Sequence, residues 1–205
     1  MRVVPSGQAC GATVLGVDLA GPLSAGLVAD IRAVWLEHLV LAFPDQPLDD
    51  DGLERFTCAM GGHGEDPFFA PVPGRQHIAA IRRRADETTP IFAESWHSDW
   101  SFLDPPPSAT VLHARIIPPV GGDTLFSNQY AALEALPAQV RARIQGLNAW
   151  HSAARGYAPD GLYGAGDKGR SMDIRPSEEA RKRRLQPMVR RHPETGREAL
   201  FVNPG

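Results

Sequence analysis

The spacing of apolar residues predicts two amphipathic helices in the first third of the chain. The first is expected over residues 25–38, where apolar side chains recur every three or four positions and would share one helix face. These residues are Leu27, Val28, Ile31, Val34 and Trp35. Ser24 stands directly before this segment and is of a residue type that caps helix N-termini. A second helix is expected over residues 50–60, with three apolar residues facing inward.

Short apolar runs predict strands along much of the remaining chain. These runs cover residues 11–19, 39–43, 76–82, 96–102 and 109–117. The segment after the second helix is rich in glycine and proline, and residues 84–95 are polar, so both are expected to be loops. Near the C-terminus, M-V-R-R-H and E-A-L-F-V-N flank P-E-T-G-R, and this arrangement predicts a β-hairpin.

Glycine and proline also delimit the helices predicted in the second half of the chain. Gly121-Gly122 opens a break, after which Ser127 is expected to cap a helix over residues 128–135. Pro137 begins the next helix, and Gly146 ends it. Many short strands with a few helices outside them predict a mainly β fold with flanking helices (α+β), of the jelly-roll type.

The composition limits the partners that the chain can bind. Of its 205 residues 42% are hydrophobic, and the formal net charge is −3 at pH 7. This charge favours neither nucleic acid nor an anionic membrane as a partner. The two cysteines, Cys10 and Cys58, lie outside any C-x-x-C pattern, and no run resembles a signal peptide or a membrane span. We therefore expect a protein of the reducing cytoplasm.

The run W-H-S-D-W contains the most informative polar pair. On a strand, residues i and i+2 point to the same face, so His97 and Asp99 would project together. An imidazole nitrogen and a carboxylate oxygen on one face can be two neighbouring ligands of a metal ion, as in the facial triad of non-haem iron sites. The same pattern fits a buried polar pair in a core strand, and these residues alone leave both interpretations open.

Two other histidines form H-x-E patterns that are weaker candidates for metal ligands. His63 lies in the glycine-rich loop, where the geometry is loose, and His192 lies at the mouth of the P-E-T-G turn. We expect structural roles for both.

Several sequence blocks around the W-H-S-D-W run resemble one enzyme family. The run is followed by P-P-P-S-A-T-V-L-H-A and by P-P-V-G-G-D-T-L-F-S-N. Upstream lie G-A-T-V-L-G-V-D-L-A-G-P-L-S and H-L-V-L-A-F-P-D-Q, and downstream lie G-L-N-A-W-H-S and V-R-R-H-P-E-T-G-R-E-A-L-F-V-N. In this order and spacing, the blocks resemble the TauD/TfdA family of iron(II)- and 2-oxoglutarate-dependent dioxygenases over essentially the whole chain. The resemblance implies a double-stranded β-helix, the cupin-like form of the jelly roll.

The resemblance also implies roles for five residues. His97 and Asp99 match the iron ligands of the family, and Thr124 matches a threonine that donates a hydrogen bond to the distal carboxylate of 2-oxoglutarate. Leu112 matches a position that lines the cosubstrate pocket, and Trp100 matches a substrate-side position, although a core role fits Trp100 equally well. The implied reaction uses Fe(II), 2-oxoglutarate and O2 to hydroxylate a small organic substrate, with decarboxylation of 2-oxoglutarate to succinate.

One departure from the family pattern concerns the substrate. In taurine-oxidising members, a histidine before a proline contacts the sulfonate, and the matching residue here is Asp66. A carboxylate repels a sulfonate, so a substrate with a cationic group or a neutral hydroxyl is expected in place of taurine. An Asx turn before Pro67 is the alternative role for Asp66.

A second departure concerns the C-terminal part of the family pattern. In the family, F-V-N is followed by closing strands that carry the second histidine ligand and the arginine that pairs with 2-oxoglutarate, and neither residue has a counterpart here. His151 falls at a different family position. We therefore expect residues 1–205 to be a single dioxygenase domain that lacks its closing strands, with weak or no activity unless a partner chain completes it.

These observations leave two hypotheses. The chain is either most of a dioxygenase or a non-catalytic jelly-roll remnant that binds a small molecule or a partner subunit. A homo-oligomer is compatible with the resemblance, because family members are often oligomers. The DNA beyond the codon for Gly205 distinguishes the hypotheses, since an in-frame continuation with a histidine and an arginine would favour the enzyme.

Overall fold

The computed structural model describes residues 1–203 and consists of two compact units. The first unit contains Met1–His63, Val111–Arg141 and Arg190–Leu200. The second contains Gly64–Thr110, Ala142–Val189 and the C-terminal residues from Phe201. Among the residues described, no helix is both long and apolar enough to span a membrane.

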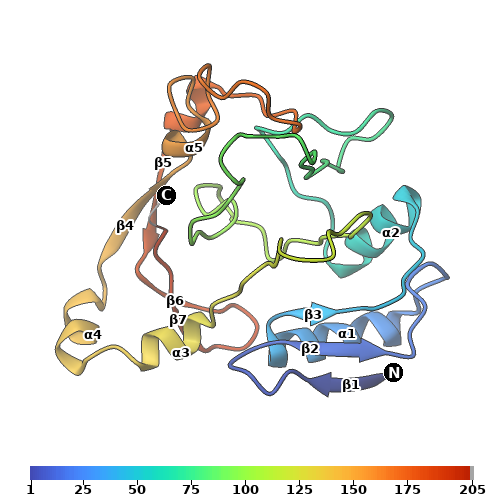
Figure 1. Cartoon of the computed structure of the whole chain (residues 1–205). Coiled ribbons are helices and arrows are strands. Elements are labelled where there is room, and N and C mark those ends of the chain that lie inside the picture. Colours follow the sequence, from blue (N-terminus) through green and yellow to red (C-terminus); the bar gives the residue numbers. More distant parts are fainter. Residues whose placement is uncertain (204–205) are drawn as a thin grey trace. The chain divides into compact units, whose positions relative to one another are not determined.

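The N-terminal segment of the first unit, Met1–His63, contains a three-stranded sheet and two helices (Figure 1). Its elements are β1 (Arg2–Pro5), β2 (Ala12–Leu15), α1 (Ala25–His38), β3 (Leu41–Ala42) and α2 (Asp50–Met60). Strand β2 pairs antiparallel with β1 and parallel with β3. The two predicted strands in this region are confirmed as β2 and β3 but are shorter than expected. Strand β1 was not predicted, because its short run offers no alternating pattern.

Both predicted N-terminal helices are confirmed, and their caps explain where they begin. The Ser24 hydroxyl accepts a hydrogen bond from the Leu27 N–H at 3.1 Å, and Asp49 Oδ1 accepts one from the Gly52 N–H at 2.7 Å. These bonds satisfy amides that a helix leaves without internal partners. The buried members of the unit's apolar core are Leu19, Ile31, Leu48 and Phe56. The core therefore forms between the two helices and the segments that lead into them.

The predicted C-terminal hairpin is also confirmed, as β6 (Val189–Arg191) and β7 (Glu198–Leu200). The His192 N–H donates to the Arg197 carbonyl at 2.8 Å, and Gly196 adopts a positive φ of 70° in the turn. Arg32 of α1 contacts this turn through a bidentate ion pair with Glu194, with Nε–Oε2 and Nη2–Oε1 distances of 2.6 and 2.8 Å. The hairpin turn is thus attached to the first helix of the same unit.

The cap predicted at Ser127 is one residue too early. Helix α3 (Gln129–Glu134) is capped by Asn128, whose Oδ1 accepts from the N–H groups of Tyr130 and Ala131 at 3.0 and 3.2 Å. The amide of Asn128 also donates to the Ala9 carbonyl at 2.7 Å, a tertiary contact that the sequence does not reveal. Helix α4 (Ala138–Ile144) confirms the predicted second helix, but it begins one residue after Pro137, and it ends before Gly146.

The second unit contains a two-stranded antiparallel sheet that was not predicted. Strands β4 (Asn148–Ser152) and β5 (Arg183–Pro187) pair so that Trp150 lies opposite Leu185 and His151 lies opposite Arg184. The apolar Trp150 and Leu185 are exposed, whereas His151 and Gln186 are buried. Because polar side chains point inward here, the usual apolar alternation is absent from the sequence.

Three predicted strands, over residues 76–82, 96–102 and 109–117, do not form. The first region keeps only an isolated bridge between Pro71 and Ala79. The second contains a turn in which the Leu103 N–H donates to the Trp100 carbonyl at 3.0 Å, and Trp100 has a φ of 45°. An extended segment becomes a strand only when a neighbour takes up its backbone hydrogen bonds, and the described residues provide no continuous ladder for these three segments.

The core of the second unit is largely aromatic. Phe68 is 1% exposed and stacks on Tyr157 with ring centroids 4.9 Å apart. Other buried members of this cluster are Phe69, Ala153, Ala158, Met172 and Ala180. Ala153 and Ala158 flank helix α5 (Ala154–Tyr157) as its cap residues, and Ala180 lies in the 3-10 turn over Glu178–Arg181. Most of the unit is irregular, so side-chain packing fixes its chain path more than strand pairing does.

A buried carboxylate joins two irregular segments of the second unit. The Glu87 side chain is 1% exposed and accepts hydrogen bonds from the Ser171 N–H at 2.9 Å and from the hydroxyls of Ser171 and Thr89. Nitrogens of Arg83 and Arg170 lie 3.6 and 4.0 Å from Glu87 Oε1. The hydrogen bonds from Ser171 and Thr89 favour the ionised form and lower the pKa of Glu87 to about 2.

This network predicts a pH dependence of stability. The pKa of Glu87 is near 4.5 without these contacts, so the carboxylate stabilises the fold above pH 4.5 and loses this effect as the pH falls toward 2. We expect Glu87→Gln to lower Tm at neutral pH and to flatten the decrease of Tm between pH 4.5 and 2. Thermal unfolding followed by circular dichroism measures both. Glu65→Gln, at an exposed site, is the control, and equal slopes in all three proteins would contradict the prediction.

Candidate metal site

His97 and Asp99 lie close together in the second unit, although the predicted strand is absent. His97 Nε2 is 3.1 Å from Asp99 Oδ1, and the two side chains are 40% and 48% exposed. Both residues belong to irregular backbone next to the turn at Trp100. The proximity of the pair therefore comes from this turn and not from the pleat of a strand. The partial exposure leaves both side chains accessible to a ligand from solution.

The hydrogen bond on the other side of the imidazole fixes its proton. His97 Nδ1 lies 2.8 Å from the Ser95 carbonyl oxygen, which can only accept, so Nδ1 carries a proton and donates it. In the neutral ring, the Nε2 lone pair then faces a carboxylate oxygen, which also carries only lone pairs. Two acceptors at this distance require a proton or a metal cation between them.

The pKa values of His97 and Asp99 also indicate that a positive charge between them is favoured. The hydrogen bond to Asp99 raises the pKa of His97, and the hydrogen bond to His97 lowers the pKa of Asp99. Both shifts mean that the pair stabilises a positive charge at Nε2. An imidazole nitrogen and a carboxylate are also common ligands of non-haem iron, so the donor set fits this metal.

Thr110 supports the carboxylate from its outer side. Its hydroxyl donates a hydrogen bond to Asp99 Oδ2 at 2.7 Å, which leaves Oδ1 facing His97. Metal ligands are typically oriented by such outer hydrogen bonds, and Ser95 does the same for His97. Sequence reasoning missed both supporting residues, because a serine carbonyl and a threonine eleven positions downstream carry no motif.

The described residues contribute two candidate ligands to this site and not three. Within residues 1–203, no group of three or more histidine, cysteine, aspartate or glutamate side chains is arranged to hold a metal ion. His151, which the sequence analysis sets apart from the ligands, is 1% exposed and stacks on Phe201 with ring centroids 5.2 Å apart. Burial lowers its pKa.

Trp100 forms one wall of the region next to Asp99. Its ring lies 5.7 Å from Tyr157, 5.5 Å from Phe102 and 6.1 Å from Phe68, measured between centroids. The core interpretation of Trp100 is therefore supported, and its substrate-side role stays a prediction. A positive φ is unusual for tryptophan, and this packing stabilises the conformation. Burial raises the pKa of Tyr157, and the negative charge of Asp99 adds to this effect.

Asp66 makes the Asx turn given as its alternative role. Its Oδ1 accepts hydrogen bonds from the N–H groups of Phe68 and Phe69 at 3.1 and 3.0 Å. Partial burial raises the pKa of Asp66, and the charge of Asp99 raises it further. The residue also lines an open hollow of about 390 Å³, together with Gly64, Glu65, Pro67, Gln76 and His77. Asp66 therefore both forms a turn and lines the hollow.

The two predicted cosubstrate residues belong to the first unit, and His97 and Asp99 belong to the second. Thr124 and Leu112 are exposed, the latter at 64%. The strand predicted over residues 109–117, which includes Leu112, does not form. Gly121 and Gly122 both have a φ of 79°, which confirms the predicted break before Thr124.

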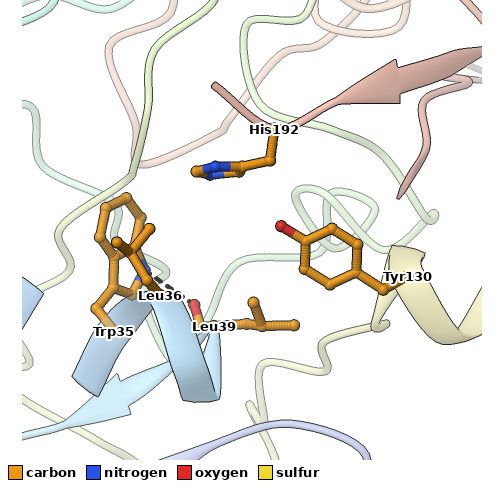
Figure 2. Close-up of a pocket in the computed structure, with 5 residues that line it drawn as sticks. All are labelled: Trp35, Leu36, Leu39, Tyr130 and His192. Atoms are coloured by element: carbon orange, nitrogen blue, oxygen red, sulfur yellow. Dashed lines mark hydrogen bonds between the residues drawn. The ribbon is translucent and has the colours of Figure 1, made fainter. Parts of the chain in front are cut away.

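The two H-x-E histidines have structural contacts. His192 Nδ1 accepts from the N–H groups of Glu194 and Thr195 at 3.2 and 3.3 Å, inside the hairpin turn. Figure 2 shows the His192 ring above a pocket formed with Trp35, Leu36, Leu39 and Tyr130. This pocket measures about 70 Å³, well below the 300 Å³ or more of typical small-molecule sites. His63 contacts the Glu54 carbonyl at 3.2 Å.

Known proteins resemble this chain in both sequence and structure. The (S)-phenoxypropionate/alpha-ketoglutarate-dioxygenase of Delftia acidovorans is 32% identical over 98% of this chain and 70% of its own length. The alpha-ketoglutarate-dependent sulfate ester dioxygenase of Pseudomonas putida is 31% identical over 98% of this chain and 65% of its own length.

Solved structures show the same relationship. A taurine dioxygenase from Burkholderia xenovorans superimposes with a TM-score of 0.72 at 31% identity, over 99% of this chain and 63% of that chain. AAD-2 in complex with Mn(II) and N-oxalylglycine superimposes with a TM-score of 0.71 at 26% identity, over 98% of this chain and 70% of that chain. The fold is therefore that of the TauD-like dioxygenases, a jelly-roll class.

The family assignment follows from the match along the chain. Residues 2–205 match the family described as taurine catabolism dioxygenase TauD, TfdA family, and the chain belongs to this family. The chain spans between 63% and 70% of the length of the four relatives compared above.

Proposed function

We propose that this chain is the iron-binding part of an Fe(II)/2-oxoglutarate-dependent dioxygenase that hydroxylates a small organic substrate. The observation that carries the proposal is the pair of facing acceptor atoms, His97 Nε2 and Asp99 Oδ1, which needs a proton or a metal cation between them. Family membership and the names of the relatives support the same conclusion.

In this proposal, the chain's residues hold and orient the metal. His97 and Asp99 are the ligands, and the carbonyl of Ser95 and the hydroxyl of Thr110 keep their ligand atoms directed at the ion. Bound iron(II), with 2-oxoglutarate and O2, supplies an oxidant for a substrate C–H bond and yields succinate and carbon dioxide. The neutral Nδ1–H tautomer of His97 is already the form required of a ligand through Nε2.

The cosubstrate residues are proposed from the family pattern. Thr124 would donate its hydroxyl proton to the distal carboxylate of 2-oxoglutarate, a charge-assisted hydrogen bond. Leu112 would contact the apolar part of the same molecule. The exposure of both residues is compatible with contact to a ligand.

The substrate is proposed to be neutral or cationic at the end that meets Asp66. Two carboxylates, Glu65 and Asp66, line the same hollow, and like charges disfavour a sulfonate or sulfate there. Trp100 would offer an aromatic surface beside Asp99. The unpaired cysteines are compatible with a cytoplasmic enzyme, and we propose a homo-oligomer on the basis of the family alone.

Succinate formation tests the proposed function. We expect the chain, supplied with iron(II), 2-oxoglutarate, ascorbate and O2, to convert 2-oxoglutarate into succinate only weakly, because the described residues provide two candidate ligands, and we expect the rate to rise when a substrate is present. Carbon dioxide release from labelled 2-oxoglutarate provides the measurement, and the metal-free chain provides the control. A folded chain that forms no succinate above that control, with any candidate substrate, would favour the non-catalytic alternative.

A second arm of the same assay tests the charge of the substrate. Matched alkyl compounds that end in an ammonium, a hydroxyl or a sulfonate group are compared as enhancers of succinate formation. We expect the sulfonate to be the weakest in the wild type and to gain at least severalfold in Asp66→Asn relative to the other two. Equal enhancement by all three in both proteins would remove Asp66 from substrate selection.

A further inference from the structure

The two candidate metal ligands do not lie in a helix or a strand. His97 and Asp99 lie on irregular backbone, where neither a helix nor a sheet ladder fixes the direction of a side chain. Precise metal binding requires ligands held within a fraction of an ångström, so other contacts have to restrain the segment. One such set of contacts before His97 is the network around the buried Glu87 carboxylate, at the far end of the same polar loop.

We propose that Glu87 is a positioning residue for the metal site, and that it acts by fixing the loop that leads into Ser95 and His97. This inference rests on the proposed function, because it assumes that His97 and Asp99 bind the metal. In this proposal Glu87 contacts neither His97 nor Asp99. It holds residues 84–95 against the segment 163–171, and that attachment sets the path of the chain into the site.

The first step of the argument is that the whole turn around Glu87 is bonded to its surroundings. Arg83 donates to the carbonyls of Glu87, Thr89 and Pro90 at 3.0, 2.7 and 3.3 Å. Arg170 donates to the same Pro90 carbonyl at 3.1 Å from the other segment. Arg170 is bonded directly to Asp167, at 3.2 Å through Nη2, and the Glu87 carboxylate lies near both guanidinium groups.

The second step connects this turn to the ligand. The Ala93 N–H donates to the Tyr163 hydroxyl at 3.1 Å, and Arg170 lies over the Tyr163 ring at 5.0 Å. The Phe92 ring packs 5.1 Å from Tyr163 and 5.6 Å from Phe69. Ala93 is two residues before Ser95, whose carbonyl accepts the Nδ1 proton of His97. These contacts, together with the short chain segment from Ala93 to Ser95, therefore connect Glu87 to the imidazole.

The third step concerns why a carboxylate is needed at position 87. Three donors meet its two oxygens: the Ser171 N–H, the Ser171 hydroxyl and the Thr89 hydroxyl. A glutamine would keep one acceptor oxygen and turn an NH2 group toward donors and arginines. It would fill nearly the same volume while losing the charge that draws the two segments together. Glu87→Gln therefore changes the restraint with little change in packing.

Metal affinity is the direct test, with Mn(II) as the probe. We expect Glu87→Gln to bind Mn(II) about 10- to 100-fold more weakly than the wild type, the range typical when an outer support of a metal ligand is lost. Electron paramagnetic resonance of free Mn(II) measures the affinity, at a temperature where both proteins are fully folded. Thr89→Val and Ser171→Ala, which each remove one hydroxyl donor to Glu87, should weaken binding to a smaller extent.

A matched control separates positioning from general destabilisation. Ile31→Val makes a small cavity in the core of the first unit, where Ile31 is 1% exposed, and it should lower Tm without changing the Mn(II) affinity. The NMR signals of the His97 imidazole give a second readout that needs no metal. We expect one sharp set in the wild type and in Ile31→Val, and broadened or multiple signals in Glu87→Gln.

The outcomes distinguish this inference from the function on which it rests. Wild-type Mn(II) affinity together with unchanged His97 signals in Glu87→Gln would overturn the positioning role. If the wild type itself binds no Mn(II), the proposed function fails, and the His97 signals alone then decide whether Glu87 positions the ring. If Glu87→Gln does not fold, the two hydroxyl variants decide the question by the same measurements.

Discussion

Replacing His97 by alanine is expected to reduce the affinity of the chain for iron(II) by more than about 100-fold, beyond the loss typical of an outer support. The substitution removes one of the two facing ligand atoms and leaves Asp99 Oδ1 without its partner at 3.1 Å. Anaerobic titration with iron(II) in the presence of 2-oxoglutarate measures the effect, through the charge-transfer absorption that forms when the cosubstrate chelates the metal.

Asp99→Asn tests the other half of the site with little change in shape. Asparagine can still accept the Thr110 hydrogen bond through its carbonyl oxygen, but it removes the negative charge that favours a cation. We expect a loss of iron(II) affinity comparable to that of His97→Ala. Thr110→Val should produce a smaller loss, because it removes only the support of the carboxylate.

His63→Ala serves as the control for these substitutions. This histidine also begins an H-x-E pattern, yet it contacts a backbone carbonyl and belongs to the first unit. It should leave both the absorption band and the iron(II) affinity unchanged. A band of full strength in His97→Ala would show that the metal binds elsewhere, and loss of the band in His63→Ala would assign that histidine to the site.

The elements that sequence patterns predicted well are those built from local signals. Helix α1 begins after Ser24 and helix α2 ends before Gly61, because capping and glycine act within a few residues of where they occur. The hairpin of β6 and β7 follows from proline and glycine in its turn. These features do not depend on which distant segment lies nearby.

The elements that were missed or wrongly predicted depend on distant partners. Residues 96–102 carry a strand-like run of apolar residues, but in the described chain no strand pairs with them. In the sheet formed by β4 and β5, the polar residues His151 and Gln186 are buried. The sequence therefore lacks the apolar alternation that would predict these strands. Whether a segment forms a strand depends on the distant segments that pair with it and bury it. A local sequence pattern does not reveal these partners.

The proximity of His97 and Asp99 was predictable from the sequence, and the contacts that support them were not. His97 and Asp99 were found from their spacing and from the family pattern, even though a turn and not a strand brings them together. Thr110 and Glu87 could not be found, because their importance lies in contacts to residues 11 and 84 positions away. The hydrogen bonds that orient His97 and Asp99 are visible only in the structure.

Replacing Phe68 by alanine is expected to lower the free energy of unfolding by about 3–5 kcal/mol, the usual cost of removing a large buried side chain. Phe68 is 1% exposed and lies within 6.1 Å, between ring centroids, of Tyr157, Phe102 and Trp100. These aromatic contacts would be replaced by a cavity, because the surrounding rings cannot all move into it. Urea unfolding followed by tryptophan fluorescence gives the change in free energy.

Phe126→Ala is the matched control, because that phenylalanine is 54% exposed and its removal should cost less than about 0.5 kcal/mol. Phe68→Leu should fall between the two. Since Trp100 packs on Phe68 and directly follows Asp99, Phe68→Ala should also weaken metal binding under conditions where the protein stays folded. A loss of stability with unchanged metal affinity would show that the turn at Trp100 keeps its shape without this aromatic support.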